Sequence, residues 1–274
     1  MIPAPFDYVR AESAEEAISL VGEHGEDAKF LAGGHSLLPL MRLRLAQPSV
    51  LIDIGRVGDM SYVREDGDQI AIGALTRLAD VEHSDVLAQH VPLLAHAAGH
   101  VGDPPVRHRG TIGGTIVHAD PAADLPATTL ALGATYVAQG PNGRREIPAG
   151  DFYQGFLTSA LAHDELLTEI RVPKMNGAGW GYQKFNRRAQ DWAIVGVAAW
   201  RRNGESGVGL VHMGSTPLLA SGVSAALASG ASIEEAAEQA AADTDPPADL
   251  NASPEYRTHL AKVLVRRALE AASA

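Results

Sequence analysis

The sequence contains no cysteine among its 274 residues. This absence excludes disulfide bonds, a thiol nucleophile and thiolate ligands for an iron–sulfur cluster, so any such cluster must belong to a partner. No apolar run approaches the ~20 residues that a membrane-spanning helix needs, and the first residues lack the basic and apolar regions of a secretory signal. We therefore expect a cytoplasmic protein without a transmembrane segment.

Positive charge is also scarce. The chain has 22 lysines and arginines against 33 aspartates and glutamates, which gives a formal net charge of −11 at pH 7. A general nucleic-acid-binding protein would show a basic face, so this class is not expected. An anionic ligand would have to be held by local hydrogen-bond donors, because the overall field repels it. The length and the 46% hydrophobic content suit a globular protein of two or three subdomains.

What the sequence does contain is two glycine pairs in similar settings. The stretch from Phe30 to Ser36 reads FLAGGHS, and the stretch from Thr111 to Pro126 reads TIGGTIVHADPAADLP. In each, an apolar run ends at the glycines and a small hydroxyl residue follows. Glycine permits a positive φ and lets a ligand approach the backbone closely, and free N–H and O–H groups suit a phosphate. We expect two anion-binding loops that form the halves of one dinucleotide site.

Each glycine pair, taken singly, also fits a simple tight turn. Neither matches the G-x-G-x-x-G fingerprint of a Rossmann site; Asp53 lies near the offset of its acidic residue, but the glycine spacing is wrong. A Walker A loop is absent, because glycine is nowhere followed by lysine and then serine or threonine. The shared chemistry of the two stretches, with no lysine beside either, favours backbone amides as the donors.

The hydrophobic pattern predicts a mixed α+β fold without regular βαβ units. Ser13 and Glu16 form a capping-box pattern, Thr76 is expected to cap a short helix, and prolines are expected to interrupt the chain at 103–105 and 245–247. Helices are expected at 14–25, 36–45, 85–100, after Asp124, and at 218–229, 232–242 and 255–272. Strands are expected up to Ala32 and at 50–54, 61–74 (a hairpin), 134–138 with 144–147 (a hairpin), 166–172, 181–186, 194–201 and 207–212, with a linker at 174–179.

Several histidines and arginines allow two interpretations each. His96 and His100 are four residues apart on an expected helix, which suits either a metal ion or packing; no third ligand suggests itself. His118 and Asp120 could form an acid–base pair or a structural hydrogen bond. The basic groups Arg107, His108 and Arg109, and Arg187 and Arg188, could offset ligand charge, face a partner or lie in solvent.

Five stretches together resemble the flavin subunit of molybdenum hydroxylases, the xanthine dehydrogenase superfamily. They read AGGHSLLPLMRLRLAQPSVLIDI, RHRGTIGGTIVHADPAADLPA, DELLTEIRVP, KFNRRAQDWAIVGVA and TDPPADLNASPEYRTHLAKVLVRRAL. The resemblance extends over essentially the whole chain. Within the superfamily, the motifs most resemble those of the medium subunits of aerobic carbon monoxide dehydrogenases.

The resemblance implies a two-subdomain FAD-binding domain of the vanillyl-alcohol-oxidase or PCMH type at 1–177, divided at about residue 57, and a smaller α+β domain at 178–274. It also implies a set of FAD-binding residues. Those that wrap the diphosphate are Ala32, Gly33, Gly34, His35 and Ser36 on one side and Thr111, Ile112, Gly113, Gly114 and Thr115 on the other. Further flavin contacts are implied at Asp124, Leu167 and Lys184, and at Trp192 near the isoalloxazine ring, where the alternative is an ordinary core tryptophan.

The implied function is electron transfer. A large subunit would oxidise substrate at a molybdenum cofactor, and a small subunit would pass electrons through two [2Fe–2S] clusters to the FAD of this chain, which would reduce a quinone or similar acceptor. The resemblance implies a dimer of heterotrimers in the cytoplasm or at the inner face of its membrane. It implies non-covalent FAD, although some related oxidases attach FAD through a Gly-Gly-His histidine such as His35. The alternatives are a self-sufficient flavin oxidase or dehydrogenase and a flavin-binding sensor.

Overall fold

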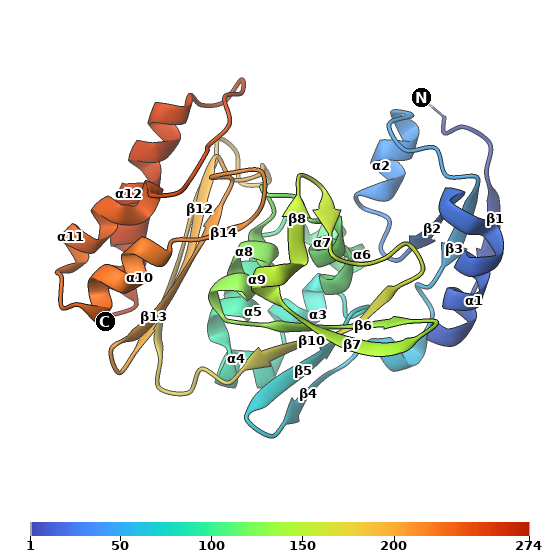
Figure 1. The fold of residues 1–274 in the computed structure, drawn as a ribbon, viewed down its shortest axis with the longest axis horizontal. Helices are drawn as coiled ribbons and strands as arrows, with labels where there is room; N and C mark the ends of the chain where they lie inside the picture. The colour runs from blue at the N-terminus through green and yellow to red at the C-terminus, as the bar shows by residue number, and fades with distance from the viewer. Residues whose placement is uncertain (1, 274) are drawn as a thin grey trace.

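A computed structural model describes residues 2–273. The chain forms three units in sequence order, each built on its own sheet (Figure 1). The N-terminal unit lies at one end of the molecule and the C-terminal unit at the other, and a central unit separates them. The mixture of helices and strands agrees with the α+β class expected from the sequence.

The N-terminal unit is a three-stranded parallel sheet in the order β1-β3-β2. Its elements are β1 (Asp7–Arg10), α1 (Ala14–His24), the 3₁₀ helix η1 (Gly25–Asp27), β2 (Ala28–Leu31), α2 (Leu37–Arg42) and β3 (Val50–Asp53). Ser13 caps α1 by accepting a hydrogen bond from the Glu16 amide, as predicted, but the Glu16 carboxylate accepts from the amide of Glu12 and not from that of Ser13. Strand β1 was not expected, because its four residues are mostly exposed and carry no apolar run.

The central unit contains a five-stranded antiparallel sheet in the order β4-β5-β10-β6-β7, with a small β8–β9 hairpin beside it. The strands are β4 (Val63–Asp66), β5 (Gln69–Gly73), β6 (Thr135–Gly140), β7 (Gly143–Pro148), β8 (Tyr153–Gly155), β9 (Thr158–Ser159) and β10 (Leu166–Pro173). The helices are η2 (Gly58–Met60), α3 (Leu78–Glu82), α4 (Asp85–His90), α5 (Pro92–Gly99), α6 (Pro104–Arg109), α7 (Ile112–His118), α8 (Asp124–Ala131) and α9 (Ala149–Phe152). The two predicted hairpins and the strand ended by Pro173 are confirmed.

Three local predictions in this unit are wrong, and two of them concern proline. The helix expected at 85–100 is two helices, because Pro92 has no N–H to donate and begins α5 as its first residue. Asp103 and Pro104 begin a helix and do not merely interrupt the chain: Asp103 caps α6 by accepting from the Val106 amide. Thr76 does not cap α3; its hydroxyl bonds to the backbone of Tyr62.

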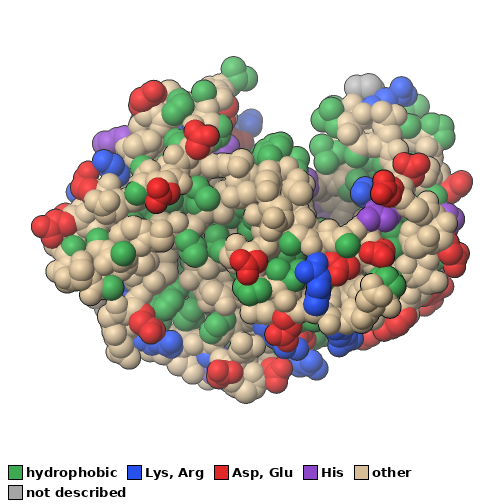
Figure 2. Space-filling model, viewed as in Figure 1, with side chains coloured by type: hydrophobic (Ala, Val, Ile, Leu, Met, Phe, Trp, Pro, Cys, Tyr) green, Lys and Arg blue, Asp and Glu red, His purple; other side chains and the backbone are tan. Residues whose placement is uncertain are grey.

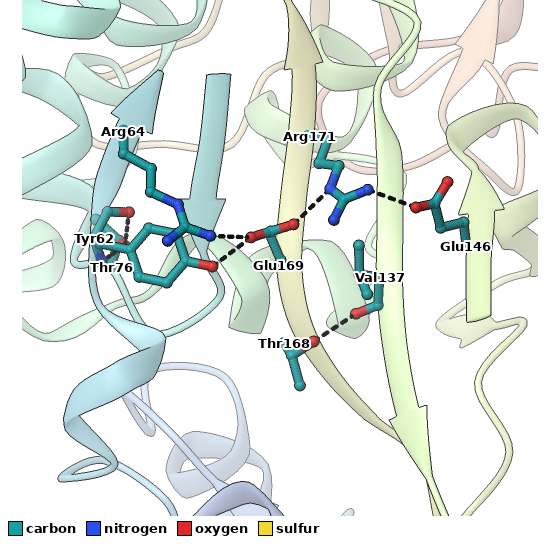
Figure 3. A network of polar contacts seen from close by, with 8 residues as sticks. All are labelled: Tyr62, Arg64, Thr76, Val137, Glu146, Thr168, Glu169 and Arg171. Atoms are coloured by element: carbon teal, nitrogen blue, oxygen red, sulfur yellow. Dashed lines mark hydrogen bonds and ion pairs between the residues drawn. The ribbon is translucent and has the colours of Figure 1, made fainter. Parts of the chain in front are cut away.

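A polar network crosses the five-stranded sheet from β4 to β7 (Figure 3). The buried Glu169 of β10 accepts from the Tyr62 hydroxyl at 2.5 Å and from Arg171 Nε at 2.6 Å, and Arg64 lies 3.5 Å away. Arg171 also donates to Glu146 of β7 at 2.5 Å. The neighbouring Ile170 belongs to the hydrophobic core, so β10 presents an apolar face to the helices and a charged face to this network.

The C-terminal unit is a four-stranded antiparallel sheet in the order β11-β12-β13-β14, with helices on its outer side (Figure 1). Its elements are β11 (Gly179–Phe185), β12 (Val195–Arg202), β13 (Glu205–Val211), β14 (Leu218–Leu219), α10 (Ser221–Ala228), α11 (Ile233–Ala237), η3 (Glu238–Ala241) and α12 (Pro254–Ala271). The helix expected at 218–229 is therefore shorter, because its first two residues pair with β13.

Helix α8 of the central unit packs against β12 and β13 of the C-terminal unit. A Cβ on Gly209 would collide with the Ala127 carbonyl, and one on Gly207 with the Ala131 carbonyl, so both positions are restricted to glycine by this close approach.

The segment predicted as a linker, 174–179, is also packed: Met175 is buried and its amide donates to the His90 carbonyl at 2.7 Å. In residues 2–273 no helix is long and apolar enough to span a membrane.

Candidate functional site

A cavity of about 580 Å³ opens between the N-terminal unit and the rest of the molecule. Figure 2 shows this face hollowed beside the lobe that carries α2 and the three-stranded sheet. Its walls come from the end of β2 and the start of α2, from α6 and α7, from the β8–β9 hairpin with β10, and from β11 with the loop before β12. The volume lies in the range typical of small-molecule and cofactor sites.

We call Phe30–Ser36 and Thr111–Pro126 the first and second glycine segments. The first has the free backbone N–H donors that the sequence predicts. Gly34 has φ of 77°, a left-handed conformation that favours glycine. Within residues 2–273 the five successive amides from Gly33 to Leu37 find no hydrogen-bond acceptor in the protein. A row of unsatisfied amides at the wall of a cavity is suited to an anion, since it supplies several charge-assisted hydrogen bonds without any counter-charge.

The second glycine segment differs from the predicted loop. Thr111 caps α7, so Gly113 and Gly114 lie in the first turn of a helix and neither has a positive φ. The four amides from Ile112 to Thr115 already donate, respectively, to Thr76 O, Ala74 O, Thr111 Oγ1 and Thr111 O. The expectation of free amides here is wrong. Gly114 instead leaves an exposed surface on the cavity wall, beside the hydroxyl of Thr115.

The first glycine segment touches the two residues that lead into the second, Arg109 and Gly110. A Cβ on Gly33 would overlap the carbonyl oxygen of Arg109, just before Thr111, so only glycine allows this approach. Arg77 donates to the same carbonyl and pairs with Thr111 through an isolated β-bridge. Burial lowers the pKa of Arg77, and the nearby Arg109 lowers it further. This contact joins Gly33 and Arg109, 76 residues apart in the sequence, and it places the two glycine segments on adjoining walls of one cavity.

An ion pair between two units lies at the far wall. The Asp124 carboxylate accepts from Lys184 Nζ at 2.9 Å and from the Tyr182 hydroxyl at 2.5 Å, and the lysine also donates to the His100 carbonyl. Both charged side chains are about 95% buried. Burial raises the pKa of Asp124, and the neighbouring lysine and tyrosine oppose this rise. Burial, reinforced by the Asp124 charge, also raises the pKa of Tyr182 well above its ordinary value.

The structure brings all but one of the residues implied by the resemblance to the cavity. Ile112 is the exception: its side chain is fully buried in the core and does not reach the wall. Trp192 lines the cavity with 69% of its surface exposed, so it is not an ordinary core tryptophan. The residues on the wall are Ala32, Gly33, Gly34, His35, Ser36, Thr111, Gly113, Gly114, Thr115, Asp124, Leu167, Lys184 and Trp192.

Of the other histidines considered as possible ligands or acid–base groups, His96 packs against neighbouring rings and His118 lies on the cavity wall. His96 packs against the rings of His100, Trp180 and Tyr182, with centroids 4.6–5.9 Å apart, and burial lowers its pKa. No group of three potential metal ligands occurs within residues 2–273. His118 lines the cavity, and burial lowers its pKa. In this part of the chain it makes no hydrogen bond to Asp120, whose carboxylate accepts from the Ala122 amide.

The arginine clusters separate into different roles. Arg107 is mostly buried and pairs with Glu82 at 2.6 Å, so it holds α6 against α3, whereas His108 and Arg109 are exposed. Arg188 is 84% exposed and pairs with Asp191 at 2.8 Å. Arg187 lies 3.4 Å from Asn251 Oδ1. None of these guanidinium groups lines the cavity.

Sequence reasoning missed most of the apolar wall. These side chains carry no polar signal, and their positions depend on how three units pack together, which no local pattern reveals. Lys29 was also missed, because it was treated as part of a strand; its place on the wall contradicts the expectation that neither glycine segment has a lysine nearby. The missed residues include Phe30, Leu37, Leu40, Leu75, Leu78, Val106, Leu157 and Leu161.

Comparisons with known proteins agree with this geometry. Residues 4–175 match the family model described as the FAD binding domain in molybdopterin dehydrogenase. Residues 180–272 match the model of the CO dehydrogenase flavoprotein C-terminal domain. The two matches together account for nearly the whole chain.

Individual relatives match over almost their full length. The carbon monoxide dehydrogenase medium chain of Hydrogenophaga pseudoflava is 44% identical over 283 residues, covering 99% of this chain and 98% of the relative. A subunit of the 6-hydroxypseudooxynicotine dehydrogenase complex of Paenarthrobacter nicotinovorans is 38% identical, covering 98% and 95%. A solved structure of the Hydrogenophaga pseudoflava carbon monoxide dehydrogenase that lacks the Mo-pyranopterin moiety of its molybdenum cofactor matches with a TM-score of 0.96 and 43% identity, covering 100% and 99%. The chain therefore belongs to the FAD-binding medium subunits of the molybdenum hydroxylases.

Proposed function

We propose that this chain is the FAD-carrying electron-transfer subunit of a carbon monoxide dehydrogenase. The observation that carries the proposal is the cavity in which both glycine segments meet, because it provides a place for a dinucleotide between the units. Support for the particular enzyme comes from identity: 44% to a carbon monoxide dehydrogenase chain against 38% to a relative from a different dehydrogenase complex. The chain has no thiolates, so the iron–sulfur clusters belong to a partner.

The residues on the cavity wall fit FAD. The free amides of residues 33–37 suit the diphosphate, and the exposed surface of Gly114 leaves room for it where a Cβ would protrude. We assign the diphosphate to the wall between Ala32–Ser36 and Thr111–Thr115. Leu167, Asp124 and Lys184 would contact the flavin half of the cofactor, and Lys184 also neutralises Asp124. Trp192 would lie against the isoalloxazine ring, where its exposed side chain would gain a partner.

Bound FAD supplies the redox chemistry, accepting single electrons and giving up pairs. The residues of this chain bind and orient it: the amides hold the phosphates, the apolar wall excludes water, and Trp192 covers one side. Substrate oxidation takes place in another subunit, so no residue of this chain serves as a general acid or base in it. Its contribution is to place the flavin between the electron donor and the acceptor.

The FAD is held without a covalent bond. His35 is exposed at the cavity wall, so covalent attachment through it can be tested directly. Acid precipitation of the purified flavoprotein is expected to release all flavin into the supernatant, with a His35→Ala variant behaving identically. Flavin that stays in the wild-type pellet and is lost from that of the variant would show covalent attachment.

The proposal includes an assembly. The chain joins a large molybdenum subunit and a small iron–sulfur subunit, two such heterotrimers pair, and a quinone accepts the electrons. The assembly works in the cytoplasm or at the inner face of its membrane. Within the chain, the FAD domain extends over 1–177, divided at about residue 57, and the C-terminal domain over 178–274. The change of sheet near residue 60 and again near residue 179 supports these boundaries.

Reconstitution tests the function directly. The chain purified alone should show a flavin spectrum but no turnover of carbon monoxide or of small organic substrates. The chain combined with the products of neighbouring genes should reduce a quinone analogue at the expense of carbon monoxide. Turnover of an organic substrate at full rate by the isolated chain would instead support a self-sufficient flavin enzyme, and flavin binding without turnover in any combination would support a sensor.

A further inference from the structure

Arg257 is a charged residue in the core of the C-terminal unit. It lies in the second turn of α12, and its side chain is 0% exposed. Leu260 and Ala261, one turn further along the same helix, belong to the hydrophobic core of this unit. Within residues 2–273, its Nε has no hydrogen-bond partner. A buried, incompletely satisfied charge is a poor source of stability, since an apolar residue of similar volume often serves as well or better.

The contacts of Arg257 lead toward the cavity. One guanidinium nitrogen, Nη1, donates to the Ile194 carbonyl, and the other, Nη2, donates to Asp249 Oδ2 at 2.7 Å. Nη1 also lies 3.1 Å from Nδ1 of His212. We call Arg257, His212 and Asp249 the Arg257 cluster. Ile194 is two residues after Trp192, so the cluster holds the end of the loop that carries this tryptophan.

His212 extends the cluster to both sides of the cavity. Its Nδ1 lies 2.9 Å from the Ala193 carbonyl, next to Trp192, and its amide donates to the Pro121 carbonyl at 2.8 Å. Pro121 lies between the wall residues Asp120 and Ala123. Burial lowers the pKa of His212, so the ring is neutral at pH 7 and Nδ1 either donates to Ala193 or accepts from Arg257. Its φ of 63° is unusual for a residue with a side chain.

Asp249, the carboxylate that Arg257 holds, organises the turn at 249–252. It accepts from the amides of Asn251 and Ala252, which fixes this turn, and Asn251 Oδ1 lies 3.4 Å from Arg187. Arg257 therefore holds the end of the loop between β11 and β12 directly, through the Ile194 carbonyl. The start of the loop lies beside the Asp249 turn, which it contacts through the exposed side chains of Arg187 and Asn251.

We propose that Arg257 is a positioning residue that sets the Trp192 loop against the FAD site. This inference rests on the proposed place of Trp192 beside the flavin. The cluster joins the C-terminal unit to two cavity walls, so it fixes how closely Trp192 covers the ring. Arg257 does not touch the cavity, and it acts on the loop through the Ile194 carbonyl and through His212, which holds the Ala193 carbonyl.

The test compares four single variants of the full chain, at Arg257 (two), Lys262 and Trp192, and one double variant, with and without FAD. Arg257→Met removes the hydrogen bonds and keeps much of the volume, whereas Arg257→Lys keeps the charge but cannot reach Ile194 and Asp249 together. Lys262→Met is the matched control, because Lys262 lies on the same helix and pairs with Glu238 at the surface. The readouts are hydrogen exchange of residues 187–194 in the FAD-free chain, FAD content, and the shape of the visible flavin bands.

We expect exchange in 187–194 to be about tenfold faster in Arg257→Met, the factor that corresponds to one lost hydrogen bond to a charged group. Arg257→Lys should recover part of this protection, and Lys262→Met should match the wild type. FAD should stay bound, because the amides of 33–37 are untouched, but its bands should shift as they do in Trp192→Ala. In Trp192→Ala, adding Arg257→Met should cause no further band shift.

The proposal would be overturned if Arg257→Met showed the wild-type exchange rate in 187–194 and the wild-type flavin bands. It would also be overturned if Arg257→Met shifted the bands equally in the wild-type chain and in Trp192→Ala. Should Arg257→Met not fold, Arg257→Lys decides by the same readouts. If Arg257→Met speeds exchange in 187–194 as expected but leaves the flavin bands unchanged, the position of Trp192 at the flavin is refuted. The contact between Arg257 and the loop would then still stand. A wild-type chain that fails to hold FAD at residues 33–37 and 111–115 would refute the proposed site itself.

Discussion

At the scale of single residues, the glycine pairs correctly indicated the position of the cavity, but each glycine is required for a different structural reason. The sequence alone does not distinguish these reasons. Gly34 is needed for its positive φ, Gly33 for its contact with the Arg109 carbonyl, and Gly114 for the open surface it leaves. The first reason is local and could be predicted. The second depends on a residue 76 positions away, and the third on a helix that begins at Thr111 where a loop was expected.

Gly114→Val tests the assigned diphosphate wall. A Cβ at this position would lie 2.8 Å from Thr111 Oγ1 and would otherwise meet only open space, so the valine methyls would occupy the cavity. We expect FAD affinity to fall by about a hundredfold, since losing one or two charge-assisted contacts costs about 3 kcal/mol. Equilibrium dialysis with FAD measures the change.

Gly58→Val is the matched control for this variant, because Gly58 is exposed and a Cβ there meets nothing within 4 Å. Gly58→Val should unfold at a urea concentration close to that of the wild type. Gly114→Val should unfold somewhat earlier, because Thr111 Oγ1 must shift away from the new Cβ, but it should stay folded in the dialysis buffer. Normal FAD content in Gly114→Val would place the diphosphate elsewhere in the cavity.

Glu169→Gln tests the polar network of Figure 3 through its pH dependence. Burial alone would raise the pKa of Glu169, but hydrogen bonds from Tyr62 and Arg171 outweigh it and hold the pKa below its ordinary value of 4.5. A depressed folded-state pKa stabilises the protein above the unfolded-state value, and this stabilisation is lost as the pH falls through the folded-state pKa. Glu169→Gln should therefore lose about 1–3 kcal/mol at pH 7 and depend less on pH below 4.5.

Urea unfolding at pH 7 and at pH 4 measures both effects. Glu205→Gln serves as the control, because Glu205 is exposed on β13 and forms no ion pair among the residues that the structure describes. A Glu169→Gln variant with the same acid sensitivity as the wild type would show that another carboxylate dominates this range.

At the scale of elements, long periodic segments were predicted well and short or interrupted ones were not. Strand β10 and helix α12 follow their hydrophobic patterns closely. Strands β1 and β14 have only four and two residues, and their pairing with distant strands, not their own composition, makes them strands. Apolar spacing around Pro92 continued from one helix into the next, so periodicity alone joined α4 and α5.

The prediction of the binding site also succeeded or failed according to how well each helix or strand was predicted. The motif at residues 111–115 was identified as part of a binding site, yet its conformation is a capped helix because Thr111 accepts from the Gly114 amide. Its amides then pair with Ala74 and Thr76, residues that only the packing of the central unit brings close. Free amides remain in the other segment, where α2 begins two residues after His35. Sequence could locate both segments but could not assign the donors between them.

At the scale of the whole molecule, the site exists only because three units meet. The N-terminal unit supplies the free amides, the central unit supplies α7 and Asp124, and the C-terminal unit supplies Lys184 and the Trp192 loop. The resemblance to a known family predicted this membership, since it covered residues from all three units. Hydrophobic periodicity and local motifs alone could not predict a site shared by three units, because they do not reveal contacts between distant segments.

The buried pair of Lys184 and Asp124 should therefore couple the C-terminal unit to the central one. Lys184→Met leaves a carboxylate about 95% buried without its counter-charge, which should lower the free energy of unfolding by about 3–5 kcal/mol. Adding Asp124→Asn removes that charge, so the double variant should recover much of the loss. Lys174→Met is the control, because its partner Glu65 is half-exposed and water can solvate that carboxylate once the lysine is gone, so the loss should be smaller than for Lys184→Met. Urea unfolding without FAD separates this effect from binding, and equal losses in the Lys184 and Lys174 variants would show that the two units are not coupled through this pair.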